Sequence, residues 1–177
     1  YLYEHEKTQA KLVFLKNDDI NKSFSISFKT VPYSDNGIFH ILEHSVLCGS
    51  AKYPVKEPFV ELLKGSFNTF LNAMTFPDKT MYPVSSKNEK DLEILMDIYL
   101  DAVFNPNLKN NPNILAQEGW HYHLEDKKDD LIYKGVVYNE MKGAYSSVDE
   151  VLDQYVTEHL FSDTSYKYSY GGKPEAI

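Results

Sequence analysis

Residues 23–50 read SFSISFKTVPYSDNGIFHILEHSVLCGS and contain both kinds of element from which we expect the fold to be built. Residues 23–28 alternate polar and apolar side chains without a break, which predicts a half-buried strand. The polar residues 34–36 then offer capping side chains before an apolar run. This pattern predicts a helix at about residues 37–48, which Gly49 ends.

The rest of the chain mixes hairpins with helices. Predicted hairpins join residues 11–16 to 23–28, 68–75 to 80–85 around a turn at 76–79, and 120–124 to 131–133. Further helices are predicted at about 58–63, 87–104, 136–144 and 147–161, the last opened by the spacing of a capping box. This mixture predicts an α+β fold, a mainly antiparallel mixed sheet with helices packed on it.

The composition is that of a soluble globular domain. Hydrophobic residues make up 42% and charged residues 25% of the 177 residues, enough for a single domain with its own core. The formal charge of −8 with no basic cluster argues against a nucleic-acid partner. No stretch approaches the roughly 20 apolar residues of a membrane-spanning helix, and one cysteine excludes an internal disulfide framework.

The helix predicted at residues 37–48 carries two histidines and a glutamate. His40 and His44 are four residues apart, so both imidazoles can point at one centre, with Glu43 on the same side. Imidazole nitrogen suits Zn²⁺, which lowers the pKa of a bound water from about 15.7 toward roughly 7, so that a nearby carboxylate can take its proton. The order His-x-x-Glu-His is the inverzincin signature. Because the pattern also arises by chance, a third ligand and the surrounding sequence have to decide.

The chain resembles the pitrilysin/insulysin family of zinc metallopeptidases, in particular its presequence protease and falcilysin branch. The resemblance rests on ordered stretches at residues 37–50, 52–54, 72–75, 82–83, 117–120, 134–143 and 171–172. It implies that residues 1–177 are most of the N-terminal zinc-binding catalytic domain of a larger, two-halved peptidase. The two ends of the sequence are consistent with this expectation, since it does not begin with Met and no predicted helix or strand follows residue 161.

The resemblance assigns roles to individual residues. His40 and His44 would be zinc ligands, Glu43 the general base and Glu140 the third ligand. Read alone, Glu140 would be a solvated carboxylate on a surface helix. Glu118 lies where the family often carries an acid near the site, so it would orient a ligand or water without binding the metal, or else cap a helix end.

Asn72, Ala73, Met74 and Thr75 match the substrate-binding strand of the family. An exposed sheet edge presents unpaired backbone groups to which an extended peptide can add as another strand. The other interpretation is an ordinary edge strand.

Other reactive side chains have simpler interpretations. His121 and His123 are two apart in a predicted strand and could share a metal, but no third ligand has an obvious spacing, so we expect them to decorate a strand face. Cys48 is expected to be a buried small hydrophobe rather than a nucleophile.

These features predict a zinc-dependent endopeptidase that degrades unfolded peptides. The resemblance also implies an Arg and a Tyr from a C-terminal half that this chain lacks, so that half is an expected partner. The alternatives are a non-catalytic structural or peptide-binding relative, a fragment that is inactive without its C-terminal half, and a hydrolase of non-peptide substrates. The resemblance suggests an organellar location, in a mitochondrion or plastid, and a cytoplasmic one is the alternative. The residues of the chain do not themselves indicate a compartment.

Overall fold

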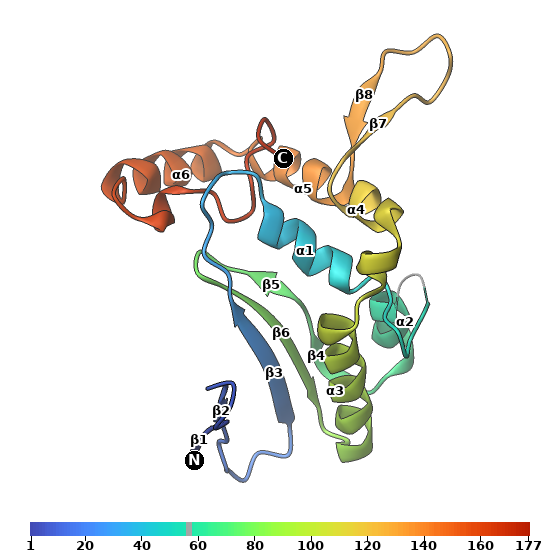
Figure 1. Ribbon diagram of the computed structural model, residues 1–177, viewed down its shortest axis with the longest axis vertical. Coiled ribbons are helices and arrows are strands. Elements are labelled where there is room, and N and C mark those ends of the chain that lie inside the picture. Colours follow the sequence, from blue (N-terminus) through green and yellow to red (C-terminus); the bar gives the residue numbers. More distant parts are fainter. Residues whose placement is uncertain (56–57) are drawn as a thin grey trace.

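The computed structural model describes residues 1–55 and 58–177 and shows the predicted α+β fold (Figure 1). The strands are β1 (Leu2–Glu4), β2 (Lys11–Val13), β3 (Lys22–Lys29), β4 (Asn68–Leu71), β5 (Met74–Thr75), β6 (Lys79–Ser86), β7 (His121–His123) and β8 (Ile132–Lys134). The helices are α1 (Ile38–Val46), α2 (Pro58–Gly65), α3 (Glu89–Phe104), α4 (Pro112–Glu118), α5 (Val136–Ala144), α6 (Val148–Leu160) and the short 3-10 turns η1 (Asn107–Asn110) and η2 (Ser165–Lys167). Within the described ranges, no helix has the length and apolarity needed to cross a membrane.

The central sheet is antiparallel and is built around β6. Strand β3 pairs with one edge of β6 along its full length, and β4 and β5 pair with the other edge. The predicted hairpin of residues 68–75 and 80–85 is therefore confirmed. Its first strand is interrupted at residues 72–73, and its turn is closed by the amide of Phe76, which donates to the carbonyl of Lys79 over 2.7 Å.

Helix α1 is fixed on two sides by apolar contacts. The larger core cluster lies between the sheet, α3 and the end of α1, and its buried members are Val46, Leu71, Tyr82, Val84, Leu95 and Tyr99. On its other side, Ile41 of α1 packs against Val137 and Met141 of α5. Burying each such side chain contributes about 1.5–3 kcal/mol. Helix α1 is therefore held between the sheet and α5 (Figure 1).

The β7–β8 hairpin projects away from the body of the molecule and connects α4 to α5 (Figure 1). Its two ends cross at glycines, because a Cβ atom on Gly135 would lie 2.0 Å from the carbonyl oxygen of Gly119. Only residues without side chains allow this approach. The crossing keeps the end of α4 beside the start of α5, which matters because each helix carries an acidic side chain near α1.

One predicted hairpin is wrong. Residues 11–16 do not pair with residues 23–28; instead β2 pairs with β1, and β3 pairs with β6. The alternation in residues 23–28 correctly indicates a strand with one apolar face, but it does not specify a partner. Strand β6 is the better partner because its own inward side chains, Tyr82 and Val84, are buried in the same core.

The predicted helix caps are only partly formed. Helix α1 begins after Gly37, which has a left-handed φ of +62°, and Asn36 accepts from the amide of Ile38 over 3.2 Å. Asp35 instead accepts from the amide of Ser169. The capping box predicted at residues 147–150 is wrong in detail, because Ser147 occupies the N-cap of α6 without a side-chain capping bond.

Candidate metal centre

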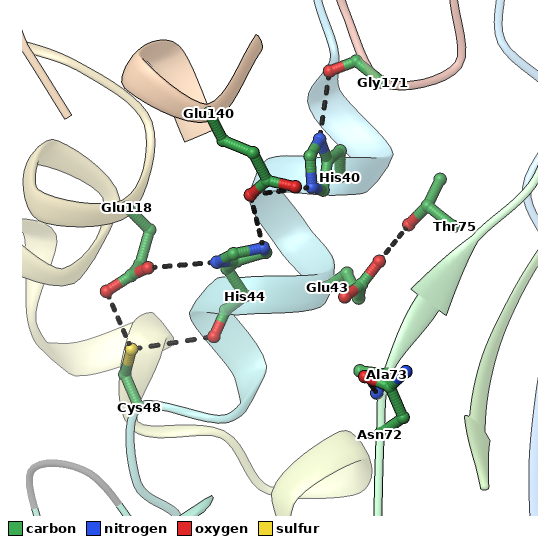
Figure 2. A network of polar contacts seen from close by, with 10 residues as sticks. All are labelled: His40, Glu43, His44, Cys48, Asn72, Ala73, Thr75, Glu118, Glu140 and Gly171. Carbon is green, nitrogen blue, oxygen red and sulfur yellow. Dashed lines mark hydrogen bonds and ion pairs between the residues drawn. The ribbon is translucent and has the colours of Figure 1, made fainter. Parts of the chain in front are cut away.

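His40 and His44 lie one turn apart on α1 with their rings facing the same centre (Figure 2). The ring centroids are 5.0 Å apart and the planes are inclined at 73°. The His40 side chain is 10% exposed and that of His44 25% exposed. Helical spacing alone brings the two rings together, as the sequence predicts.

Glu140 on α5 faces both rings. Its Oε2 lies 3.7 Å from Nε2 of His40 and 3.6 Å from Nε2 of His44. One ligand atom from each of these residues lies within 4.8 Å of the other two, and in the described part of the chain no other group of three His, Cys, Asp or Glu residues does so. The Glu140 side chain is 54% exposed, so its position toward α1, rather than its burial, distinguishes it from an ordinary surface carboxylate.

These spacings fit a tetrahedral zinc ion. Bonds of about 2.0–2.2 Å at tetrahedral angles place ligand atoms roughly 3.3–3.6 Å apart. Glu140 Oε2 lies 3.6 Å from one histidine Nε2 atom and 3.7 Å from the other, at the upper end of this range. Two imidazoles and one carboxylate also match the ligand set of catalytic zinc sites, which keep a fourth position open.

Each histidine ring has an outer partner on its Nδ1 atom. Nδ1 of His40 lies 3.1 Å from the carbonyl oxygen of Gly171, which can only accept a hydrogen bond. The neutral tautomer that satisfies this carbonyl carries its proton on Nδ1, which leaves the Nε2 lone pair for a metal ion. Nδ1 of His44 faces Glu118 Oε2 at 3.4 Å in the same way. Such partners fix the tautomer and orientation of metal-binding histidines.

Glu118, at the end of α4, is a buried acid held beside His44. Gln117 Nε2 donates to its Oε1 over 2.8 Å, and the Cys48 thiol donates to the same oxygen over 3.3 Å (Figure 2). Burial raises the pKa of Glu118, but the bonds from His44, Cys48 and Gln117 outweigh it and hold that pKa below its usual value. Cys48 is half-buried and bonded to this carboxylate, which corrects its expected role as a purely apolar side chain.

The site is electronegative. Burial lowers the pKa of His44, but the surrounding carboxylates Glu118, Glu43 and Glu140 outweigh burial and raise it overall. Burial first, and then the negative charge of Glu43, raise the pKa values of Tyr82 and Tyr99 below α1. Both phenols therefore stay neutral. Such an arrangement favours a positive charge at the centre.

Glu43 points away from Glu140 toward the sheet. It is only 6% exposed, and its Oε2 accepts from the hydroxyl of Thr75 over 2.6 Å (Figure 2). Glu43, His40, His44, Glu118 and Glu140 all line a cavity of about 1060 Å³. The strand residues Asn72, Ala73, Met74 and Thr75 line the same cavity. The structure therefore brings every predicted site residue to one cavity.

The carbonyl of Gly171 is the contact that sequence reasoning missed. It approaches His40 because Gly37 lies against Gly171 and Gly172, where a Cβ on Gly37 would be 2.7 Å from the Gly171 oxygen. The glycine pair at 171–172 belongs to the resemblance, but a backbone carbonyl has no side-chain signature. Lys173 anchors this turn, since its amide donates to the Asp35 carbonyl over 2.8 Å.

His121 and His123 lie outside the centre, as expected. Nδ1 of His121 faces the carbonyl of Ala116 at 2.8 Å, and Nε2 of His123 faces Oε2 of Glu125 at 2.7 Å. Neither belongs to a three-ligand group among the residues that the structure describes. They decorate one face of β7.

Comparisons with known proteins show the family of the chain. Residues 32–172 match the family model Insulinase (Peptidase family M16). The chain is 60% identical over 175 residues to Protein HypA of Clostridium perfringens, covering 99% of this chain and 18% of that protein. It is 53% identical over 176 residues to Presequence protease 1, chloroplastic/mitochondrial, of Arabidopsis thaliana, covering 99% and 16%.

The fold also matches a solved structure. The crystal structure of pitrilysin superposes with a TM-score of 0.61 at 22% identity, covering 89% of this chain and 15% of that one. This match confirms the predicted fold class. The chain spans less than a fifth of the length of these relatives.

Proposed function

The chain belongs to the insulinase family of metallopeptidases (peptidase family M16), and from this premise we propose that it is the N-terminal catalytic domain of a larger zinc endopeptidase that degrades unfolded peptides. The observation that carries the proposal is that His40, His44 and Glu140 each place one ligand atom within 4.8 Å of the other two. The acid Glu43 lines the same cavity and adds the proton acceptor that hydrolysis needs.

The site residues divide into proposed metal ligands with their hydrogen-bond partners, and a proposed general base. His40 and His44 would hold the zinc through Nε2 and Glu140 through a carboxylate oxygen, with Glu118 and the Gly171 carbonyl fixing the rings. Zinc bound there would polarise the scissile carbonyl and acidify the attacking water.

Glu43 is the proposed general base. Its carboxylate is the acid on α1 that lines the cavity, one residue before His44 and away from Glu140 (Figure 2). It would accept a proton from the attacking water and return it to the leaving amine. Burial at 6% exposure keeps bulk water from competing for this carboxylate.

The substrate would lie along residues 72–75. Strand β5 pairs with β6 on one edge, and the same residues line the cavity opposite the histidines. An extended peptide added to the other edge of β5 would be held by backbone hydrogen bonds, which are indifferent to side chains. A folded protein offers no free strand of this kind, so the arrangement selects unfolded peptides. A C-terminal half, the other expected partner, would close the cavity over the peptide.

Zinc removal tests this function in the full-length gene product. We expect a strong chelator to abolish cleavage of an unfolded peptide, and one equivalent of zinc per chain to restore it. A small ester should not be hydrolysed at a comparable rate. Peptide cleavage that persists in metal-free protein would contradict the proposal, and peptide binding without cleavage in zinc-loaded protein would favour a non-catalytic peptide-binding role.

The relatives differ in location. The Arabidopsis protein is named as chloroplastic and mitochondrial, whereas Protein HypA is bacterial. We propose an organellar or bacterial setting for this chain accordingly, to be decided by imaging or fractionation of the native protein.

A further inference from the structure

We propose that Thr75 is a positioning residue, whose hydroxyl holds the Glu43 carboxylate in place for proton transfer, rather than a side chain that binds substrate. The inference rests on the proposed role of Glu43 as general base. It concerns a contact between β5 and α1 that the spacing of residues 40–44 does not reveal.

The contact is short and partly buried. Thr75 Oγ1 lies 2.6 Å from Glu43 Oε2. A carboxylate that is 6% exposed needs hydrogen-bond donors, because burying an unpaired charge is costly. Among the described residues, the Glu43 carboxylate accepts a side-chain hydrogen bond from the Thr75 hydroxyl. An ionised carboxylate can only accept, so the direction of the bond is fixed.

Thr75 is itself rigidly placed. It pairs with Thr80 of β6 in the antiparallel register, and the turn that follows is closed between Phe76 and Lys79. On the other side of β6, the hydroxyls of Thr80 and Thr30 are 2.8 Å apart. A β-branched side chain also has few χ1 states. The hydroxyl is therefore held on the edge strand β5 by its pairing with β6, while Glu43 comes from α1.

Other nearby polar groups are engaged elsewhere. The Tyr99 hydroxyl donates to the carbonyl of Asn72 over 3.3 Å, and the Asn72 side chain accepts from the amide of Ala73 over 3.0 Å. These bonds shape the start of the 72–75 segment. The Thr75 hydroxyl alone in this segment is turned toward the proposed base (Figure 2).

The consequence is a separation of roles within one strand. The backbone of residues 72–75 would hold the peptide, whereas the Thr75 hydroxyl would restrict the side-chain torsions of Glu43. A general base must stay within hydrogen-bond reach of the proton that it takes, and small misplacements of a reacting group cost rate. Loss of the hydroxyl should therefore lower kcat and leave KM nearly unchanged.

Thr75→Val and Thr75→Ser in the full-length gene product test the inference. Valine keeps the shape and strand preference but removes the hydroxyl, and serine keeps the hydroxyl. We expect kcat to fall about 10–100-fold in Thr75→Val, with KM changed by less than about twofold. Thr75→Ser should restore kcat to within about threefold of the parent, and both variants should bind one zinc per chain.

Thr80→Val is the matched control, because Thr80 lies opposite Thr75 in the register and its hydroxyl contacts Thr30 rather than Glu43. It should lower the melting temperature without lowering kcat. A second measurement, of peptide binding, does not depend on catalysis. The Kd of an unfolded peptide for the zinc-loaded Glu43→Gln variant, measured by fluorescence anisotropy, should not change when Thr75→Val is added.

Either of two kinetic results would overturn the inference alone. One is an unchanged kcat in Thr75→Val while Glu43→Gln is inactive; the other is a rise in KM and peptide Kd with kcat preserved, which would make Thr75 a substrate-binding residue. Loss of zinc from Thr75→Val would also overturn it, since Thr75 bonds to Glu43 and to none of the proposed ligands. Full activity of Glu43→Gln would remove the base itself and so overturn both this inference and the proposed function.

Discussion

The Glu43→Gln variant is expected to cleave peptides about 10²–10⁴ times more slowly than the parent protein, with zinc still bound. Glutamine has nearly the same shape and can still bond to Thr75, but it cannot accept the proton of the attacking water. Glu43 points toward Thr75 rather than toward Glu140 and is not one of the three proposed ligands, so its replacement leaves all three in place (Figure 2). Steady-state kinetics together with metal analysis of the same sample measures both effects.

Glu93→Gln is the matched control for this change, because Glu93 is an exposed acid on α3 away from the cavity. Its kcat should equal that of the parent. Retention of parental kcat in Glu43→Gln would contradict the proposed base. Loss of zinc together with activity would instead place Glu43 among the ligands.

The Glu140→Gln variant is expected to lose far more zinc affinity than Glu118→Gln. Glu140 Oε2 faces both Nε2 atoms, so its loss removes a ligand, whereas Glu118 contacts the outer nitrogen of His44. Loss of an outer partner typically costs about 10–100-fold in metal affinity, and loss of a ligand should exceed that range. Competition with a chromogenic chelator gives both dissociation constants.

Glu150→Gln controls for charge in this comparison, since Glu150 lines the same cavity from α6 but does not belong to the three-ligand group. Its zinc affinity should stay within about threefold of the parent. A larger loss of zinc affinity in Glu118→Gln than in Glu140→Gln would exchange the two roles. Equal losses of zinc affinity in all three variants would mean that the cation is attracted by the general negative charge of the cavity and not by specific ligands.

The local elements were predictable because their signals are local. Helix α5 matches the predicted residues 136–144, and the turn at 76–79 joins the predicted strands. Helix α4 was not predicted, although Asn111 caps it, Pro112 opens it and Gly119 ends it. Seven residues are too few for a periodic apolar face to stand out.

The site was predictable in part, for the same reason. The spacing of His40, Glu43 and His44 places all three side chains on the same side of one helix. Glu140 could be placed only by resemblance, because its approach depends on how α5 packs on α1 through Ile41. The Gly171 carbonyl needed coordinates, since it acts through the backbone and has no side-chain pattern in the sequence.

Anomalous diffraction at the zinc edge from crystals of the zinc-loaded full-length protein is the most direct examination of the centre. We predict one strong peak per chain, about 2.0–2.2 Å from Nε2 of His40, Nε2 of His44 and a carboxylate oxygen of Glu140. A peak bonded to other side chains, or none at this position in a protein that cleaves peptides, would contradict the account.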